Sequence, residues 1–388
     1  MEEDRAPVRF VDHLARDAVA QGASDIHLEP SGDGWRIRLR IDGLLRTVRP
    51  PPATVVTKAV ARLKLLGRMD VAQRRLPQDG RVELQGAGGR RLHFRASTCP
   101  TIHGEKLVLR LIESTGVHRL DELGCPPGPR TLLEEAVARP DGLILVTGPT
   151  GSGKSATLHA ALRTVNTPER HICTVEDPVE MEAPGATQTA VHRQTGLDFP
   201  TALRAFLRQD PDIIMIGEIR DAETADIAVK AAQTGHLVLS TLHTRTAVGA
   251  VERLIHMGVA PYDVASSLSV VVAQRLVRRL CPDCRRPDPL SDAARQELSL
   301  AEPPVSVYAA GGDRGCRRCH GGYRGRTGLF QVLPITPEMA RAVAEGAPPE
   351  TLDAEARRAG AGDLFSAGLD LVTRGVTSLA EVRRVVRE

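Results

Sequence analysis

One stretch of the chain has the residue types and the spacing needed to bind a polyphosphate. Residues 148–155 read GPTGSGKS and match the pattern G-x-x-x-x-G-K-[ST] at every fixed position. The apolar run 143–147 before this loop predicts a buried parallel strand, and residues 156–162 after it predict a helix. In this arrangement backbone N–H groups surround the phosphates, Lys154 reaches the β- and γ-phosphates, and Ser155 holds Mg²⁺. The sequence therefore predicts an ATP or GTP site with these contacts: Gly148, Pro149, Thr150, Gly151, Ser152, Gly153, Lys154, Ser155 and Thr157.

Two acidic groups follow short apolar runs downstream of the loop. Residues 212–218 read DIIMIGE, so an apolar strand ends in Gly217 and Glu218. A phosphate-binding loop needs an acid on a neighbouring strand to orient Mg²⁺ or water, which makes Glu218 the candidate. Residues 174–180 read TVEDPVE and place Glu176 at another strand tip, as a general base or water-positioning residue. Spacing alone does not separate this interpretation of Glu176 from a solvated acidic loop.

Several histidines and arginines are further candidates for contacting the phosphates, but residue type alone does not select among them. His236 and His243 bracket the apolar run 237–240 and could contact the γ-phosphate, although a histidine beside a strand is more often structural. Arginine is suited to stabilising the charge of a transferring phosphoryl group. Because nearly all basic residues here are arginine, the sequence alone does not single out Arg95 and Arg110 as catalytic arginines.

Four of the seven cysteines form two C-x-x-C pairs. Cys281 and Cys284 make the first pair and Cys316 and Cys319 make the second, with 31 residues between the pairs. Two such pairs match the form of a four-thiolate structural Zn²⁺ site with an inserted excursion, and the alternative is reduced thiols. In a reducing compartment this pattern favours a metal over a disulfide.

Length and composition bound the kind of protein that carries these groups. A chain of 388 residues with 41% hydrophobic and 26% charged residues is typical of a globular protein of two or three domains. The net charge of +3 gives no case for direct nucleic-acid binding. No apolar run approaches the roughly 20 residues of a membrane span, and no signal-peptide core follows the N-terminus. We therefore expect a cytoplasmic protein that meets membranes only through partners.

The elements that must position the candidate groups fall into five segments. Residues 1–113 predict a small α+β domain, with helices over 10–20 and 54–66 and strands over 26–28, 35–41, 81–85, 92–98 and 106–112. Residues 114–130, rich in glycine and proline, predict a linker. Residues 131–280 alternate strands with helices and predict an α/β nucleotide-binding core. A cysteine module over 281–333 and a helical C-terminal subdomain over 334–388, broken at 375–378, complete the chain.

Several of these segments together resemble one known family. Residues 148–155, 176–180, 207–221 and 234–244 resemble the Walker A, Asp-box, Walker B and His-box motifs of secretion ATPases. These are the motors of bacterial type II secretion and type IV pilus assembly, the GspE/PilB group. The N-terminal domain agrees through GASDIHLEP at 22–30, LPQDGR at 76–81 and GEKLVLR at 104–110. The resemblance runs from about residue 10 to the end.

The resemblance implies a hexameric Mg²⁺-dependent ATPase with a PAS-like N-terminal domain and a RecA-like P-loop core. It assigns Glu176 as the catalytic glutamate, Glu218 as the Walker B acid and His243 as the His-box residue. It places family arginines at Arg95 and Arg110, which would reach the γ-phosphate from the N-terminal domain. The four cysteines favour the assembly and secretion branch over the pilus-retraction branch.

The expected function is that of a cytoplasmic motor, peripheral to the inner membrane. ATP hydrolysis would move an inner-membrane platform protein and so power type IV pilus assembly or type II protein secretion. Two alternatives belong to other classes: an ATPase of a DNA-uptake pseudopilus or of DNA translocation, and a nucleotide-gated scaffold without useful hydrolysis. The chain also departs from the family, with Arg245 and Thr246 where Asn-Asp is usual and Gln331 where glutamate is usual.

Overall fold

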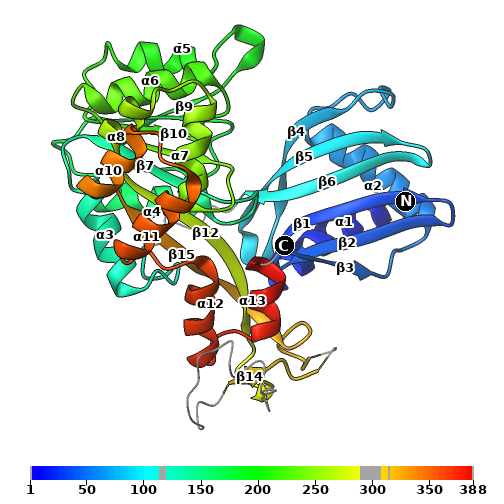
Figure 1. Ribbon diagram of the computed structural model, residues 1–388. Helices are drawn as coiled ribbons and strands as arrows, with labels where there is room; N and C mark the ends of the chain where they lie inside the picture. Colours follow the sequence, from blue (N-terminus) through cyan, green and yellow to red (C-terminus); the bar gives the residue numbers. More distant parts are fainter. Residues whose placement is uncertain (1, 113–118, 289–306, 313–314, 387–388) are drawn as a thin grey trace. The chain divides into compact units, whose positions relative to one another are not determined.

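The computed structural model describes residues 2–112, 119–288, 307–312 and 315–386 (Figure 1). The chain divides into two compact units, Met1–Thr115 and Gly116–Glu388. Among the described residues, no helix combines the length and apolar character that crossing a bilayer demands.

The N-terminal unit is an antiparallel sheet with two helices packed on one face. The strand order is β3-β2-β1-β6-β5-β4. Side chains alternate along each strand, so one face carries the apolar residues that pack against the helices and the other carries charges. Its elements are α1 (Glu2–Ala20), β1 (Ala23–Ser31), β2 (Gly34–Ile41), β3 (Leu44–Val48), α2 (Ala53–Leu66), β4 (Gln78–Gln85), β5 (Arg91–Thr101) and β6 (Gly104–Ile112).

The C-terminal unit is built on a seven-stranded sheet in the order β15-β12-β7-β11-β10-β8-β9. All pairs are parallel except β12 with β15 at one edge. Every residue of the central strands is buried, and each aliphatic side chain buried there contributes about 1.5–3 kcal/mol. The strands are β7 (Gly142–Thr147), β8 (Ile172–Glu176), β9 (Ala186–Ala190), β10 (Ile213–Ile216), β11 (Leu237–Leu242), β12 (Leu268–Leu280) and β15 (Tyr323–Pro334).

Helices cover both faces of this sheet (Figure 1). One face packs against α3 (Pro127–Val137) and α4 (Lys154–Val165). The other packs against these helices: α5 (Phe199–Phe206), α6 (Ala222–Gln233), α7 (Ala247–His256), α8 (Pro261–Ser267), α10 (Pro337–Ala344), α11 (Pro349–Arg358) and α12 (Leu364–Thr373). A parallel sheet covered on both faces explains why its strands are continuous apolar runs rather than alternating ones.

A buried acid fixes the C-terminal helix α13 (Leu379–Val386) to the end of β12 that precedes the first cysteine pair. Glu381 is 1% exposed and accepts hydrogen bonds from Arg278 of β12 at 2.6 Å and from Arg384 at 2.7 Å. Arg278 also lies over the Tyr323 ring at 3.9 Å. The short strands β13 (Arg286–Pro287) and β14 (Tyr308–Ala309) pair nearby in sequence, between the two cysteine pairs. The break predicted at 375–378 is confirmed, because α12 ends at Thr373 and α13 begins at Leu379.

The structure moves two segment boundaries. Helix α3 begins at Pro127, inside the segment 114–130 predicted as a linker. Strand β15 lies inside the predicted cysteine module 281–333, yet it pairs with β12 and belongs to the main sheet. Both differences arise because an apolar surface of the core needs cover, which glycine and proline content does not reveal. Residues 113–118 of the predicted linker, and 289–306 and 313–314 of the predicted module, lie outside the described residues.

Candidate nucleotide-binding and hydrolysis site

The predicted phosphate loop follows β7, and its last two residues, Lys154 and Ser155, begin α4, as the sequence pattern requires. The Lys154 ammonium lies inside the loop and donates hydrogen bonds to the carbonyls of Gly148 at 2.9 Å and Pro149 at 3.1 Å. Burial lowers the pKa of Lys154 to about 8, with the Glu218 carboxylate opposing this shift and Arg275 adding to it. Ser155 is exposed in the first turn of α4, where a helix N-terminus favours anions.

Glycine is required in the loop for two reasons. Gly148 has φ of 153° and Gly153 has φ of 89°, values that side-chain-bearing residues rarely adopt. A Cβ atom at Gly148 would lie 2.5 Å from the Gln274 carbonyl, and one at Gly153 would lie 2.9 Å from the Gln274 amide nitrogen. The loop is therefore packed directly on β12 through Gln274.

Gln274 was not among the predicted site residues. It is 1% exposed, and its side-chain oxygen accepts a 2.7 Å hydrogen bond from the Thr157 hydroxyl. Thr157, predicted to contact the nucleotide, therefore has its hydroxyl turned into the protein between α4 and β12. The available signal for Gln274 was a polar residue directly after the apolar run 270–273, since a buried amide must find partners.

The sheet order brings the other predicted groups of the C-terminal unit to the same edge as the loop. Strands β7, β11, β10 and β8 are consecutive neighbours and run parallel. Their carboxyl ends carry, in this order, the phosphate loop, His243, Glu218 and Glu176. Ligand sites of open parallel sheets form at this edge.

Glu176 is buried at the end of β8 and held by three side chains. Its Oε1 atom accepts hydrogen bonds from the Thr174 hydroxyl at 2.8 Å and the Gln188 amide at 2.9 Å. Its Oε2 atom lies 3.3 Å from Nε2 of His159, which belongs to α4. Burial raises the pKa of Glu176, but the hydrogen bonds from His159, Gln188 and Thr174 outweigh burial and leave the pKa below its ordinary value. The side chain is therefore ionised at neutral pH.

Glu218 lies at the end of β10 among cationic groups. Its carboxylate pairs with Arg220 and lies 3.5 Å from Nε2 of His243. Burial and the nearby Lys154 ammonium lower the pKa of His243, while Glu218 acts in the opposite direction. A Cβ atom at Gly217 would lie 3.3 Å from the Glu176 Cα atom, so glycine at this position lets the two strand ends approach closely. The two acidic strand ends are thus in contact through their backbones.

A pair of threonines connects the phosphate loop to the segment after β11. The Thr147 hydroxyl, at the last residue of β7, accepts a 2.9 Å hydrogen bond from the Thr244 backbone N–H. The two hydroxyls lie 2.7 Å apart. The Arg275 guanidinium also donates to the Arg245 carbonyl at 2.9 Å, so the unusual residue at 245 contributes its backbone to this connection. The segment carrying His243 is therefore fixed relative to the loop.

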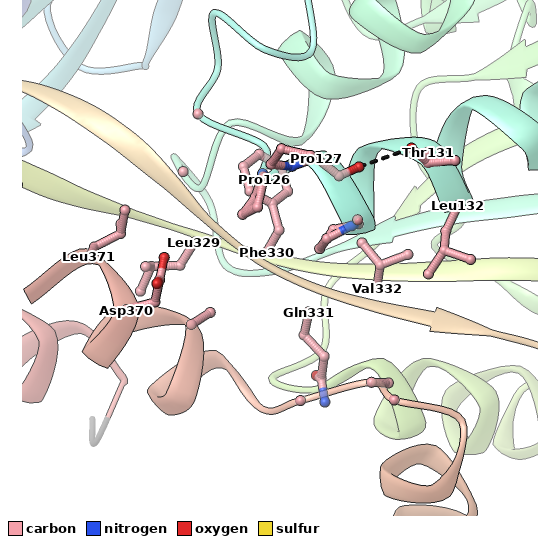
Figure 2. A pocket seen from close by; sticks show the side chains of 18 of the residues that line it. Pro126, Pro127, Thr131, Leu132, Leu329, Phe330, Gln331, Val332, Asp370 and Leu371 are labelled. Carbon is pink, nitrogen blue, oxygen red and sulfur yellow. Dashed lines mark hydrogen bonds between the residues drawn. The ribbon is translucent and has the colours of Figure 1, made fainter. Parts of the chain in front are cut away.

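Gln331, the second departure from the family pattern, lies on β15 and is 9% exposed. Its side-chain oxygen accepts a 3.2 Å hydrogen bond from the Ala247 N–H at the start of α7. An amide oxygen accepts this bond, and a glutamate carboxylate at this position could accept it as well. Gln331 also borders a cavity of about 890 Å³ between α3, β15 and α12, lined mainly by apolar residues such as Pro126, Phe330 and Leu371 (Figure 2).

The predicted arginines of the N-terminal unit lie side by side on its charged face. Arg95 of β5 stands directly opposite Arg110 of β6 in the antiparallel register. Arg110 pairs with Asp25 at 2.8 Å, and Arg95 lies 3.8 Å from Asp79. Two guanidinium groups on neighbouring strands make this row suited to a polyanion.

The four predicted cysteine ligands form one cluster. Their sulfur atoms all lie within 4.8 Å of one another. Cys281 and Cys316 are 3.9 Å apart at sulfur, and Cys284 and Cys319 are 3.6 Å apart. Tetrahedral Zn–S bonds of about 2.3 Å imply S···S separations of about 3.8 Å. The donor set and its spacing therefore fit zinc.

A parallel α/β sheet with a phosphate loop after one strand and acids after two neighbours defines a P-loop nucleotide-binding protein. The profile of the family described as "Type II/IV secretion system protein" matches residues 1–384, so the chain belongs to this family of secretion and pilus-assembly ATPases. The resemblance stated from the motifs is confirmed.

Similar proteins agree with this assignment. The type IV pilus assembly ATPase PilB of Acinetobacter baylyi is 44% identical over 393 residues, covering 100% of this chain and 67% of the relative. The type II secretion system protein E of Aeromonas hydrophila is 45% identical over 390 residues, covering 100% of this chain and 77% of the relative.

Two solved structures share the fold. The pilus retraction motor PilT with bound ADP has a TM-score of 0.64 at 26% identity, over 96% of this chain and 95% of that chain. The Legionella pneumophila ATPase DotB has a TM-score of 0.71 at 22% identity, over 97% and 95%, and supports the fold alone.

Proposed function

We propose that this secretion-family ATPase is a cytoplasmic, hexameric, Mg²⁺-dependent motor that powers type IV pilus assembly or type II secretion. The observation that carries the proposal is the row of strand ends that brings Lys154, His243, Glu218 and Glu176 to one edge of the sheet. Identities of 44% to a pilus-assembly ATPase and 45% to a type II secretion protein, against 26% to a retraction motor, support the assembly and secretion branch.

The side chains of the C-terminal unit have separate roles in ATP hydrolysis. Lys154 and the N-terminal N–H groups of α4 bind the phosphates. Ser155 and Glu218 would hold the Mg²⁺ of the substrate, which neutralises phosphate charge. Glu176, ionised and fixed, orients the attacking water, while His243 contacts the γ-phosphate region. Glu218 pairs with the half-exposed Arg220, a partner that its carboxylate can exchange for the metal ion.

Charge that develops on the transferred phosphoryl group is stabilised by cations. Arg95 and Arg110 are our candidates, acting from the N-terminal unit, for which we propose a PAS-like fold. ATP binding would bring the N-terminal unit to the RecA-like core, and hydrolysis would release it. Repeated around a ring, this cycle would move an inner-membrane platform protein, and the chain would meet the membrane only through that partner.

The cysteine cluster is proposed as a structural Zn²⁺ site held by Cys281, Cys284, Cys316 and Cys319. A closed set of four thiolates stabilises the fold and leaves no open position for catalysis. Metal analysis of the purified protein should return one zinc per chain, and a Cys281→Ser/Cys284→Ser variant should return none. Purified protein without zinc would reject this assignment.

Phosphate release from Mg·ATP by the purified protein tests the enzymatic part of the proposal. Wild-type protein should release phosphate, and Lys154→Ala should not, because it loses the group that binds the β- and γ-phosphates. Turnover without any dependence on Mg²⁺ would contradict the assigned roles of Ser155 and Glu218. Absence of turnover in the wild-type hexamer would favour the nucleotide-gated scaffold.

The cellular role requires a separate experiment. Deleting the gene and scoring pili, released exoproteins and DNA uptake side by side should show a loss of pili or of secretion. Complementation with Lys154→Ala should fail, whereas complementation with wild type should succeed. Strong stimulation of turnover by DNA would instead support a DNA-translocating ATPase.

A further inference from the structure

One buried histidine contacts the proposed catalytic acid although no sequence motif singled it out. His159 lies on α4, the helix that begins with Lys154, and is 2% exposed. Its Nε2 atom lies 3.3 Å from Oε2 of Glu176. A carboxylate only accepts hydrogen bonds, so Nε2 must carry the hydrogen.

The other oxygen of Glu176 is already fully used. Oε1 accepts from the Thr174 hydroxyl and from the Gln188 amide, which stands opposite Thr174 on β9. Gln188 is itself held in place, because its oxygen accepts from the Ala183 N–H at 2.7 Å and its nitrogen donates to the Met181 carbonyl at 3.0 Å. Each carboxylate oxygen offers about two lone pairs. Oε1 is therefore saturated, whereas Oε2 keeps one free acceptor position beside its bond to His159.

We infer that His159 is a positioning residue which fixes Oε2 of Glu176 as the oxygen that orients the attacking water. The inference rests on the proposed function, because it takes Glu176 as the water-positioning acid. Helix α4 would then contribute both to phosphate binding and to the positioning of the attacking water. His159 and Lys154 share α4, so the helix that binds the phosphates also sets the direction of the free lone pair.

A purely space-filling role for His159 fits the site less well. Within the described part of the chain, its Nδ1 atom is buried without a hydrogen-bond partner. Leaving a buried polar atom unpaired destabilises a fold, and an apolar side chain of similar size would avoid this. Among the residues that the structure describes, the hydrogen bond to Glu176 is the one interaction of His159 that an apolar residue would not make.

Two substitutions separate positioning from packing. His159→Leu removes the donor but keeps an apolar side chain of similar volume, and His159→Gln keeps an amide N–H near the place of Nε2. We expect His159→Leu to lower kcat for ATP about tenfold, the size of one lost hydrogen bond to a charged group, with KM for ATP unchanged within about twofold. His159→Gln should restore most of kcat. If the leucine variant fails to fold, His159→Asn, whose shorter amide does not reach Oε2, replaces it.

A double-mutant cycle with Glu176→Gln shows whether His159 acts through the acid. His159→Leu should cause no further loss in the Glu176→Gln background. Thr164→Val is the matched control on α4, because the Thr164 hydroxyl donates to the Ala161 carbonyl and not to Glu176, and it should change kcat by no more than about twofold. Equal kcat in wild type and His159→Leu, or an undiminished effect of His159→Leu without Glu176, would overturn the inference. Wild-type turnover in Glu176→Gln would instead overturn the proposed role of the acid itself.

Discussion

Glu176 and Glu218 stand at the ends of neighbouring parallel strands, yet their side chains have different surroundings. Glu176 has 8% of its side chain exposed and is held by residues of α4, β8 and β9. Glu218 has 15% exposed and faces Arg220 and His243. A carboxylate fixed by several donors keeps one geometry, whereas one paired with a half-exposed arginine can exchange that partner for a metal ion. Two acids in contact through their backbones therefore take different roles because their partners differ.

The largest expected effect comes from removing the charge of the fixed acid. Glu176→Gln should lower kcat by about 100-fold or more, because water loses its positioning group. Binding of ATP should remain close to wild type, since Glu176 does not hold the phosphates. Steady-state phosphate release combined with equilibrium binding of a fluorescent nucleotide measures both quantities. A variant that loses binding and turnover together would show that Glu176 supports the fold of the site instead.

Glu218→Gln should act on the metal rather than on the water. We expect the Mg²⁺ concentration for half-maximal turnover to rise about tenfold, with much of kcat recovered at saturating Mg²⁺. Titration of turnover with Mg²⁺ at fixed ATP provides the measurement. The comparison between the two acids fails if Glu176→Gln shows this same rescue by Mg²⁺.

Lys154 should make nucleotide binding sensitive to pH. Because its pKa is lowered to about 8, the ammonium begins to lose its proton as the pH rises through 8, and the attraction to phosphates weakens. ATP affinity should therefore be highest below pH 8 and fall several-fold by about pH 9, with proton uptake on binding in that range. Calorimetric titrations in buffers of different ionisation enthalpy detect that uptake. Lys154→Arg, which keeps its charge, should remove the pH dependence if it binds ATP.

The smallest expected effect concerns the backbone contact between the two acidic strands. Gly217→Ala places a Cβ atom 3.3 Å from both the Glu176 Cα atom and the Val175 carbonyl. We expect a loss of about 1 kcal/mol in the free energy of unfolding, from overpacking between β8 and β10. Gly362→Ala is the control, since a Cβ atom there meets nothing within 4 Å. Equal unfolding midpoints for the two variants would show that the strands separate without cost.

The sequence was most informative where chemistry restricts residue type. The phosphate loop, the two acidic strand ends and the paired cysteines follow fixed spacings, and the sheet brings the loop and both acids to one edge. Contacts that depend on tertiary packing were not foreseen. His159, Gln188 and Gln274 are ordinary polar residues in sequence and become important only because distant elements place them against the site.

The boundaries of the cysteine module were missed for a related reason. The module was placed over 281–333 from its two cysteine pairs, and this range includes the apolar residues of β15. Antiparallel pairing with β12 is a long-range interaction, and no local pattern reports it. The pairing with β12 is what makes β15 part of the main sheet.

The long β12–β15 ladder has a mechanical consequence. β12 carries Gln274 against the phosphate loop and continues to Leu280, immediately before Cys281. At about 3.3 Å per residue, the seven residues from Gln274 to Cys281 span about 23 Å. Hydrogen bonds between antiparallel strands are perpendicular to the strand axis, so tension along this axis loads many of them at once in shear. A force applied at the cysteine cluster would thus be transmitted along β12 to Gln274, which packs against the phosphate loop, with little extension of the strand.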